Sequence, residues 1–100
     1  MPQLPALQNL SLDSNNIRTF EFLPQQPNLQ QLYLKSNRIR SLRSMPSLPN
    51  LEKLDLRTNP IKTLEYIPQL PSLQRLGIEP VLREALRRLN EGRQVLIREL

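Results

Sequence analysis

The feature that most constrains this chain is a sequence motif that returns every 22 residues. The segments LQNLSLDSNNI from Leu7, LQQLYLKSNRI from Leu29 and LEKLDLRTNPI from Leu51 share the pattern L-x-x-L-x-L-x-x-N-x-I. A fourth copy begins at Leu73 as LQRLGIEPV and has Val81 where the others have asparagine. A repeat of this length predicts a solenoid, because one such unit cannot bury its apolar side without a neighbour stacked on it.

The L-x-L spacing within each copy predicts a short β-strand. Successive side chains of a strand point to opposite faces, so both leucines face one way and the residue between them faces the other. The leucines expected to face the core are Leu10, Leu12, Leu32, Leu34, Leu54 and Leu56. The intervening Ser11, Tyr33 and Asp55 are expected to face outward on a parallel sheet.

The segments that connect the motifs repeat as well. Apolar residues recur at Phe20, Leu42 and Leu64, and again at Leu23, Met45 and Ile67. Prolines form two columns, Pro2, Pro24, Pro46 and Pro68, then Pro5, Pro27, Pro49 and Pro71. Proline fixes φ and removes a backbone donor, so these segments cannot form long regular helices. We expect extended or short 3₁₀ pieces on this side of the solenoid.

One asparagine follows each strand, at Asn15, Asn37 and Asn59. The turn after a strand leaves backbone donors and acceptors inside a solenoid, and an inward asparagine offers two donors and an acceptor to satisfy them. The sequence therefore predicts that these three side chains form a buried structural ladder.

The last twenty-one residues read as a cap on residues 1–79, whose units start near residues 7, 29, 51 and 73. Pro80 suits the first turn of a helix, and an apolar stripe follows at Val81, Leu82, Ala85, Leu86 and Leu89. The pattern predicts a helix over about 80–91, stopped by Gly92. The apolar tail QVLIREL that completes residues 80–100 is expected to form a short strand or flap against the last repeat.

The period, the L-x-x-L-x-L-x-x-N-x-I core and the further apolar columns resemble the 22-residue class of leucine-rich repeats. That class includes a regulatory subunit of protein phosphatase one, a spliceosomal protein and dynein light chains. The run TNPIKTLEYIPQLPSLQRLG followed by EPV is similar to the class's C-terminal cap, but Gly77 directly follows Leu76 with no aspartate between them. The resemblance implies an α/β fold: a right-handed solenoid with a parallel concave sheet, a 3₁₀ or extended convex side, a capping helix and protein partners.

The outward side chains of neighbouring strands are expected to form columns across a polar concave face of mixed sign. Tyr33 is the only aromatic residue among them and lies near the middle, where a rigid amphipathic side chain can anchor a partner. Each position is equally compatible with an ordinary solvated sheet. The residues predicted to contact a protein partner are Gln31, Tyr33, Lys35, Lys53, Asp55, Arg57 and Arg75.

A second surface offers an alternative. Five cations, Arg18, Arg38, Arg40, Arg43 and Lys62, are expected to line one edge of the arc, and we call this set the basic ridge. Stacked like charges favour an acidic or phosphate-bearing partner, including a ribonucleoprotein. No aromatic stacking platform or glycine-rich phosphate loop is visible beside these residues, so nucleic acid is the less favoured partner.

Composition removes most other functions. The chain has no cysteine and no histidine, which excludes disulfides, thiol chemistry and the usual zinc ligands. We expect no catalytic residues, no metal and no cofactor, because no nucleophile with a base and no paired carboxylates are visible. No apolar run is long enough to cross a bilayer, and no signal peptide is present, so an intracellular site, cytoplasmic or nuclear, is expected.

The N-terminal end lacks a counterpart to the cap. Met1 to Ala6 occupy the loop positions of a repeat that has no first half. The open edge at Leu10 to Leu12 is expected either to continue a longer array, of which this chain is a self-assembling fragment, or to pair with another copy or another protein.

Overall fold

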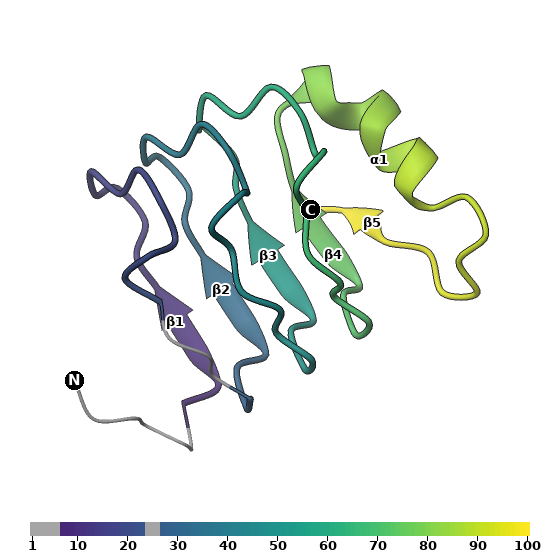
Figure 1. Cartoon of the computed structure of the whole chain (residues 1–100), viewed down its shortest axis with the longest axis horizontal. Coiled ribbons are helices and arrows are strands. Elements are labelled where there is room, and N and C mark those ends of the chain that lie inside the picture. The colour runs from purple at the N-terminus through teal and green to yellow at the C-terminus, as the bar shows by residue number, and fades with distance from the viewer. Residues whose placement is uncertain (1–6, 24–26) are drawn as a thin grey trace.

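The computed structural model describes residues 7–23 and 27–100 and shows one sheet of parallel strands with a helical cap (Figure 1). Pro2, Pro5 and Pro24, and the loop positions assigned to Met1–Ala6, lie outside the described residues. The strands are β1 (Asn9–Ser11), β2 (Gln31–Tyr33), β3 (Lys53–Asp55), β4 (Arg75–Gly77) and β5 (Arg98–Glu99), and they follow one another in the sheet in sequence order.

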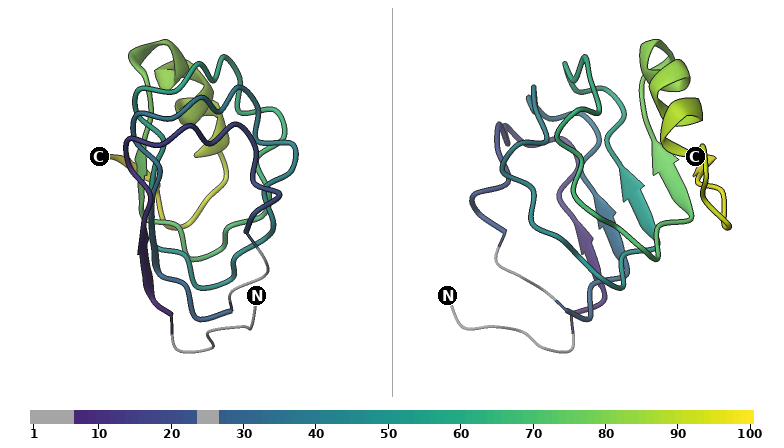
Figure 2. Two further views of the ribbon diagram at one scale, coloured as in Figure 1. Left: turned by 90° about the vertical axis from the view of Figure 1, so that its left-hand side faces the viewer. Right: turned by 45° about the vertical axis from the view of Figure 1, so that its right-hand side comes forward.

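The leucine columns of the sequence are columns in space. Leu10 is paired with Leu32, Leu32 with Leu54, and Leu54 with Leu76, in parallel register across β1 to β4. Leu32, Leu54 and Leu76 are completely buried. The expected parallel stacking of 22-residue coils is therefore confirmed. Viewed end-on, the coils have the strands on one side and the connecting segments on the other, around a shared interior (Figure 2).

The connecting side of each coil is made of tight turns. Backbone hydrogen bonds from the fourth residue to the first close turns at Phe20–Leu23, Leu42–Met45 and Leu64–Ile67, with N–O distances of 2.9–3.1 Å. Proline-containing turns follow at Leu48–Leu51 and Leu70–Leu73. These single turns match the expected 3₁₀ or extended convex side, and no α-helix occurs there in residues 7–23 and 27–79.

The chain turns inward just after each strand. Ser14, Ser36 and Thr58 have φ values of 60°, 61° and 59°, in the left-handed region that side chains disfavour. Hydrogen bonds between coils hold this conformation: the Ser14 N–H donates to the Lys35 carbonyl (2.8 Å) and the Ser36 N–H to the Arg57 carbonyl (3.0 Å). After Ser36 and Thr58, the asparagine that follows the left-handed residue is buried in the interior.

Asn37 and Asn59 are buried and bond to two coils at once. The Asn59 Nδ2 donates to the Leu34 carbonyl of the preceding coil (2.8 Å) and to the Leu56 carbonyl of its own (3.1 Å), while its Oδ1 accepts from the Ile39 N–H (3.0 Å). Asn37 Nδ2 likewise donates to the carbonyls of Leu12 and Leu34, both at 3.0 Å.

The prediction of a buried ladder was wrong for Asn15, whose side chain is exposed. Its Nδ2 donates only within its own coil, to the carbonyls of Leu12 (2.9 Å) and Asp13 (3.2 Å). The physical reason is position: β1 is the first strand of the described sheet, so no described coil lies outside it to bury Asn15 or to receive its second set of bonds.

The C-terminal region begins with a 3₁₀ turn, η1 (Pro80–Leu82), and continues as helix α1 (Arg83–Leu89), shorter than the helix expected over about 80–91. Val81 does not share the buried stripe, because the 3₁₀ turn points it outward, and it is 74% exposed. Leu82 and Leu86 do face the core. The helix ends at Leu89 with Asn90 as its C-cap, and Gly92 takes a positive φ of 80° in the turn beyond it.

The tail returns to the sheet as its fifth strand. β5 is parallel to β4, with Arg98 opposite Arg75 and Glu99 opposite Leu76. Asn90 ties helix to tail, because its Nδ2 donates to the Ile97 carbonyl (2.9 Å) and its Oδ1 accepts from the Ile97 N–H (2.8 Å). Ile97 is buried by this pairing, whereas Val95 and Leu96 remain exposed.

Candidate protein-binding surfaces

The concave sheet face brings together the side chains that sequence analysis predicted for a partner. Gln31 and Tyr33 lie on β2, and the Tyr33 hydroxyl donates to Gln31 Oε1 (2.8 Å), which fixes the ring along the strand. Lys53 on β3 is half-buried, like both β2 residues, whereas Lys35 and Arg75 are exposed. The face therefore presents an ordered aromatic ring among cations.

Asp55 lies on the same face but is not available as the exposed contact residue that was predicted. It is only 3% exposed, and Arg57 grips its carboxylate through Nε to Oδ1 and Nη2 to Oδ2, both at 2.9 Å. The Arg57 backbone N–H also donates to Asp55 Oδ1 (3.1 Å). Residues two apart in extended backbone share a face, so the D-x-R spacing is itself a sequence signal for this pair.

Gly77 explains how Asp55 becomes buried. A Cβ atom at Gly77 would clash with Asp55 Oδ1 and lie 3.1 Å from Leu100 Cδ1, so the missing side chain makes room for both. Leu100 borders two shallow hollows on this face. One, of about 370 Å³, includes Gln31, Lys53 and Arg75. The other, of about 380 Å³, includes Lys35 and Arg57.

The environment of Asp55 favours its charged form. Burial by itself raises its pKa, but hydrogen bonds from the side chain and backbone of Arg57, with the positive charges of Arg57 and Lys35, outweigh burial and lower the pKa below its usual value. The Asp55–Arg57 pair thus holds the end of β3 in place and leaves Arg57 with little unbalanced charge.

A stability difference should follow from this pKa. Because the folded-state pKa lies below the unfolded value of about 4, the pair stabilises the protein fully above that pH, and the benefit is lost as pH falls through the folded-state pKa. Asp55→Asn should lower the free energy of unfolding at pH 7 by about 1 kcal/mol, a value discounted because Arg57 is partly exposed. Urea unfolding of wild type and Asp55→Asn from pH 7 down to pH 2 measures the difference in their free energies of unfolding, which should become smaller at acid pH.

Glu65→Gln is the matched control, since Glu65 is an exposed carboxylate with no ion pair in the described part of the chain. If the difference in free energy of unfolding between wild type and Asp55→Asn stayed constant with pH, the assigned role of the carboxylate charge would be contradicted.

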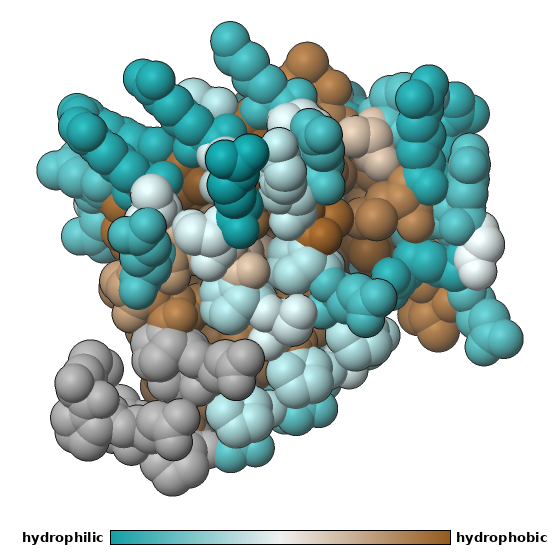
Figure 3. Space-filling view, viewed as in Figure 1, coloured by the Kyte–Doolittle hydropathy of each residue, from teal (hydrophilic) through white to brown (hydrophobic). Residues whose placement is uncertain are grey.

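The basic ridge forms a second surface, where the coils of β1 and β2 turn away from the sheet. Four of its five members, Arg18, Arg38, Arg40 and Arg43, line a hollow of about 730 Å³. Lys62 is exposed and is not part of this lining. Figure 3, which views the connecting side of the coils, shows hydrophilic side chains projecting along the same margin of the molecule.

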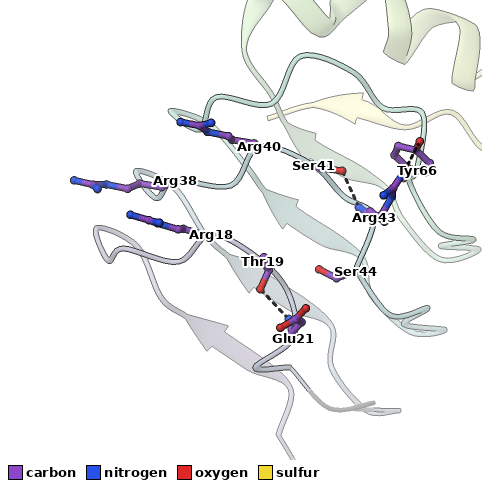
Figure 4. A pocket seen from close by; sticks show the side chains of 9 residues that line it. All are labelled: Arg18, Thr19, Glu21, Arg38, Arg40, Ser41, Arg43, Ser44 and Tyr66. Carbon is purple, nitrogen blue, oxygen red and sulfur yellow. Dashed lines mark hydrogen bonds between the residues drawn. The ribbon is translucent and has the colours of Figure 1, made fainter.

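The hollow also contains one aromatic ring, that of Tyr66, which the sequence analysis did not place beside the ridge. The Arg43 guanidinium lies 4.7 Å from the centre of the Tyr66 ring, and Arg43 Nη2 donates to the Tyr66 hydroxyl (3.0 Å). Figure 4 shows Arg43 pointing toward Tyr66 on the next coil. The two residues are 23 positions apart, which is one 22-residue repeat plus one residue. They therefore occupy different positions in their repeats, and aligning equivalent positions of the repeats does not place them together.

Two kinds of feature are absent from residues 7–23 and 27–100. This part of the chain contains no helix that is long and apolar enough to span a membrane. Nor does it hold any group of three or more acidic, histidine or cysteine side chains that could bind a metal ion.

Coils of one strand and two turns, stacked in parallel register around a shared leucine core, define a repeat solenoid. Residues 27–69 match the family model described as Leucine Rich repeats in two copies. No curated protein and no solved structure matches the chain. Leucine-rich-repeat domains generally mediate protein–protein interaction.

Proposed function

We propose that this protein is a scaffold that binds another protein on its concave sheet face, through a contact centred on Tyr33. The observation that carries the proposal is the environment of that ring. It lies on β2, held by its bond to Gln31, and is only half-buried. A held aromatic side chain loses little conformational entropy on binding, which favours its use as an anchor.

The charges around Tyr33 define the partner's chemistry. Lys35, Lys53 and Arg75 form no ion pair within the described residues, whereas Arg57 is matched by Asp55. We therefore assign Lys35, Lys53, Arg75 and Gln31 to the polar rim of the binding site. The Asp55–Arg57 pair holds the neighbouring strand end in place. The partner we propose is an acidic protein surface that places an apolar pocket over the tyrosine ring.

Several finer assignments belong to the same proposal. The 22-residue period supports placing the coils in the class that includes the regulatory subunit of protein phosphatase one. A binding role rather than an enzymatic one, without cofactor, agrees with the general use of these repeats. Residues 1–79 would carry the repeats and residues 80–100 the cap. A cytoplasmic or nuclear location is supported by a composition without cysteine.

The test begins by replacing Tyr33 with a photo-crosslinking phenylalanine derivative, to identify partners in a cell extract. Each candidate is then purified and its affinity measured against Tyr33→Ala. We expect a loss of about thirtyfold, the effect of removing a central aromatic anchor worth about 2 kcal/mol. Melting should be almost unchanged, since the ring is half-exposed.

The matched control is Tyr66→Ala, which removes the same side chain from the other surface. It should leave this affinity within about twofold of wild type. A partner that binds Tyr33→Ala as well as wild type would contradict the proposed concave site. Self-association through the β1 edge is a separate outcome, since Leu10, Leu12 and Ile17 are only partly buried there. Light scattering would detect it as a larger species at high concentration.

A further inference from the structure

We propose that the hollow lined by Arg18, Arg38, Arg40, Arg43 and Tyr66, here called the arginine hollow, binds a phosphorylated segment of a protein partner. This surface is separate from the concave face, and the inference does not depend on the function proposed there. It rests on three features of the hollow: the placement of its arginines, the hydroxyl groups beside them and the occupied face of its single aromatic ring.

The fold itself concentrates the positive charge. Ile39 is completely buried, so Arg38 and Arg40 on either side of it both point outward. Arg18 follows the inward Ile17 in the same way on the preceding coil, and the Arg38 N–H donates to the Ile17 carbonyl (2.8 Å), which fixes the two coils side by side. Figure 4 shows these three arginines extending in the same direction.

The three arginines lack intramolecular neutralisation. Arg18, Arg38 and Arg40 form no ion pair within the described residues, and Glu21 is the only acidic side chain among those that line the hollow. Guanidinium groups held on adjacent coils repel one another, and a doubly charged anion between them would remove that repulsion.

Hydroxyl groups at the hollow add hydrogen-bond donors. Ser44 Oγ accepts the Phe20 N–H (2.9 Å), Ser41 Oγ accepts the Arg43 N–H (3.1 Å) and Thr19 Oγ1 accepts the Glu21 N–H (3.4 Å). None of these three hydroxyls donates a hydrogen bond within the described part of the chain. Their protons are therefore available to an acceptor-only ligand.

These features suit a phosphate monoester better than a carboxylate. A phosphorylated serine or threonine carries a charge of about −1.5 to −2 and three strong acceptor oxygens, so it can engage two or three guanidinium groups and a hydroxyl at once. A carboxylate carries one charge and two oxygens. Phosphate recognition by clustered arginines is a general mode of peptide binding.

The geometry favours a phosphorylated protein over RNA. Single-stranded nucleic acid is held by a series of aromatic faces on which successive bases stack. Tyr66 is the one aromatic residue among those lining the hollow, and the Arg43 guanidinium already lies over its ring. The ring instead holds Arg43 at the edge of the hollow, where its remaining N–H groups can reach a ligand.

The experiment uses three fluorescent peptide pools with random flanking residues and a fixed central phosphoserine, serine or glutamate, together with an oligouridylate. Binding to the full chain is measured by polarisation at physiological salt. We expect the phosphoserine pool to bind at least about tenfold more tightly than the other two pools and the oligouridylate. Arg38→Gln/Arg40→Gln should abolish that advantage, and Tyr33→Ala should preserve it.

Arg87→Gln/Arg88→Gln is the matched control, because it removes the same charge from helix α1, where both arginines pair with Glu84. It should retain the preference for phosphoserine. Equal binding of the phosphoserine and glutamate pools, tighter binding of the oligouridylate, or an unaltered Arg38→Gln/Arg40→Gln variant would each overturn the proposal. All four arginines replaced in these two variants are exposed, so circular dichroism melts should coincide with wild type.

Discussion

Asn59→Ala is expected to lower the free energy of unfolding by about 4 kcal/mol, a large part of the 5–15 kcal/mol that stabilises a typical domain. The substitution leaves the Ile39 N–H and the carbonyls of Leu34 and Leu56 without the partners that Asn59 now supplies. Each buried polar group left unsatisfied costs about 1–3 kcal/mol, and the Ile39 N–H and the Leu56 carbonyl are left so between two coils, whereas the Leu34 carbonyl still accepts from Asn37 Nδ2.

Asn15→Ala provides the control because it deletes the same side chain at the equivalent position of the first described coil. The Asn15 side chain is exposed and bonds only to its own coil, so we expect a loss of about 1 kcal/mol or less. Urea unfolding followed by circular dichroism measures both variants. Equal losses for the two substitutions would show that the ladder stabilises single turns and does not join the coils.

The interior was predictable because its physics is local and repeated. A strand alternates its side chains, so the spacing of Leu32 and Leu34 alone places both in the core, and the 22-residue period places Leu54 beside Leu32. The same reasoning predicted an inward asparagine after each strand. It failed at Asn15 because burial of a side chain depends on the next coil as well as its own.

The surfaces were less predictable because they depend on relations that the period does not encode. Asp55 is buried by an arginine two residues beyond the end of its strand and by the absence of a side chain at Gly77. Tyr66 reaches the basic ridge through a diagonal contact with Arg43 on the preceding coil. Both contacts depend on the length and direction of the side chains. Aligning the repeats identifies only which residues occupy equivalent positions.

The two proposed binding surfaces belong to different parts of each coil. Tyr33 is a strand residue whose neighbours are set by sheet register, while Arg38 and Arg40 lie after the strand and flank the buried Ile39. Surface substitutions at separated sites on a packed solenoid have additive effects when they share no partner. The two surfaces should therefore be separable by mutation.

Phe20→Ala is the second substitution expected to have a large effect, a loss of about 3–5 kcal/mol in the free energy of unfolding. Phe20 is completely buried at the start of the turn that ends at Leu23, and its N–H donates to Ser44 Oγ on the next coil (2.9 Å). Truncating the ring removes apolar contacts and leaves a cavity between the first two coils, which surrounding turns closed by hydrogen bonds cannot easily fill.

Phe22 provides the matched control for Phe20, because it lies in the same turn but is 43% exposed. Phe22→Ala removes the same atoms from a site that water already reaches, so its cost should be about 1 kcal/mol or less. Thermal and urea unfolding of both variants measure the contrast. If Phe22→Ala proved the more damaging, the connecting segment would have to be rotated so that Phe22 and not Phe20 enters the core. Since Arg18 lies two residues before Phe20, that rotation would also change the direction of Arg18 and remove the geometry on which the arginine hollow depends.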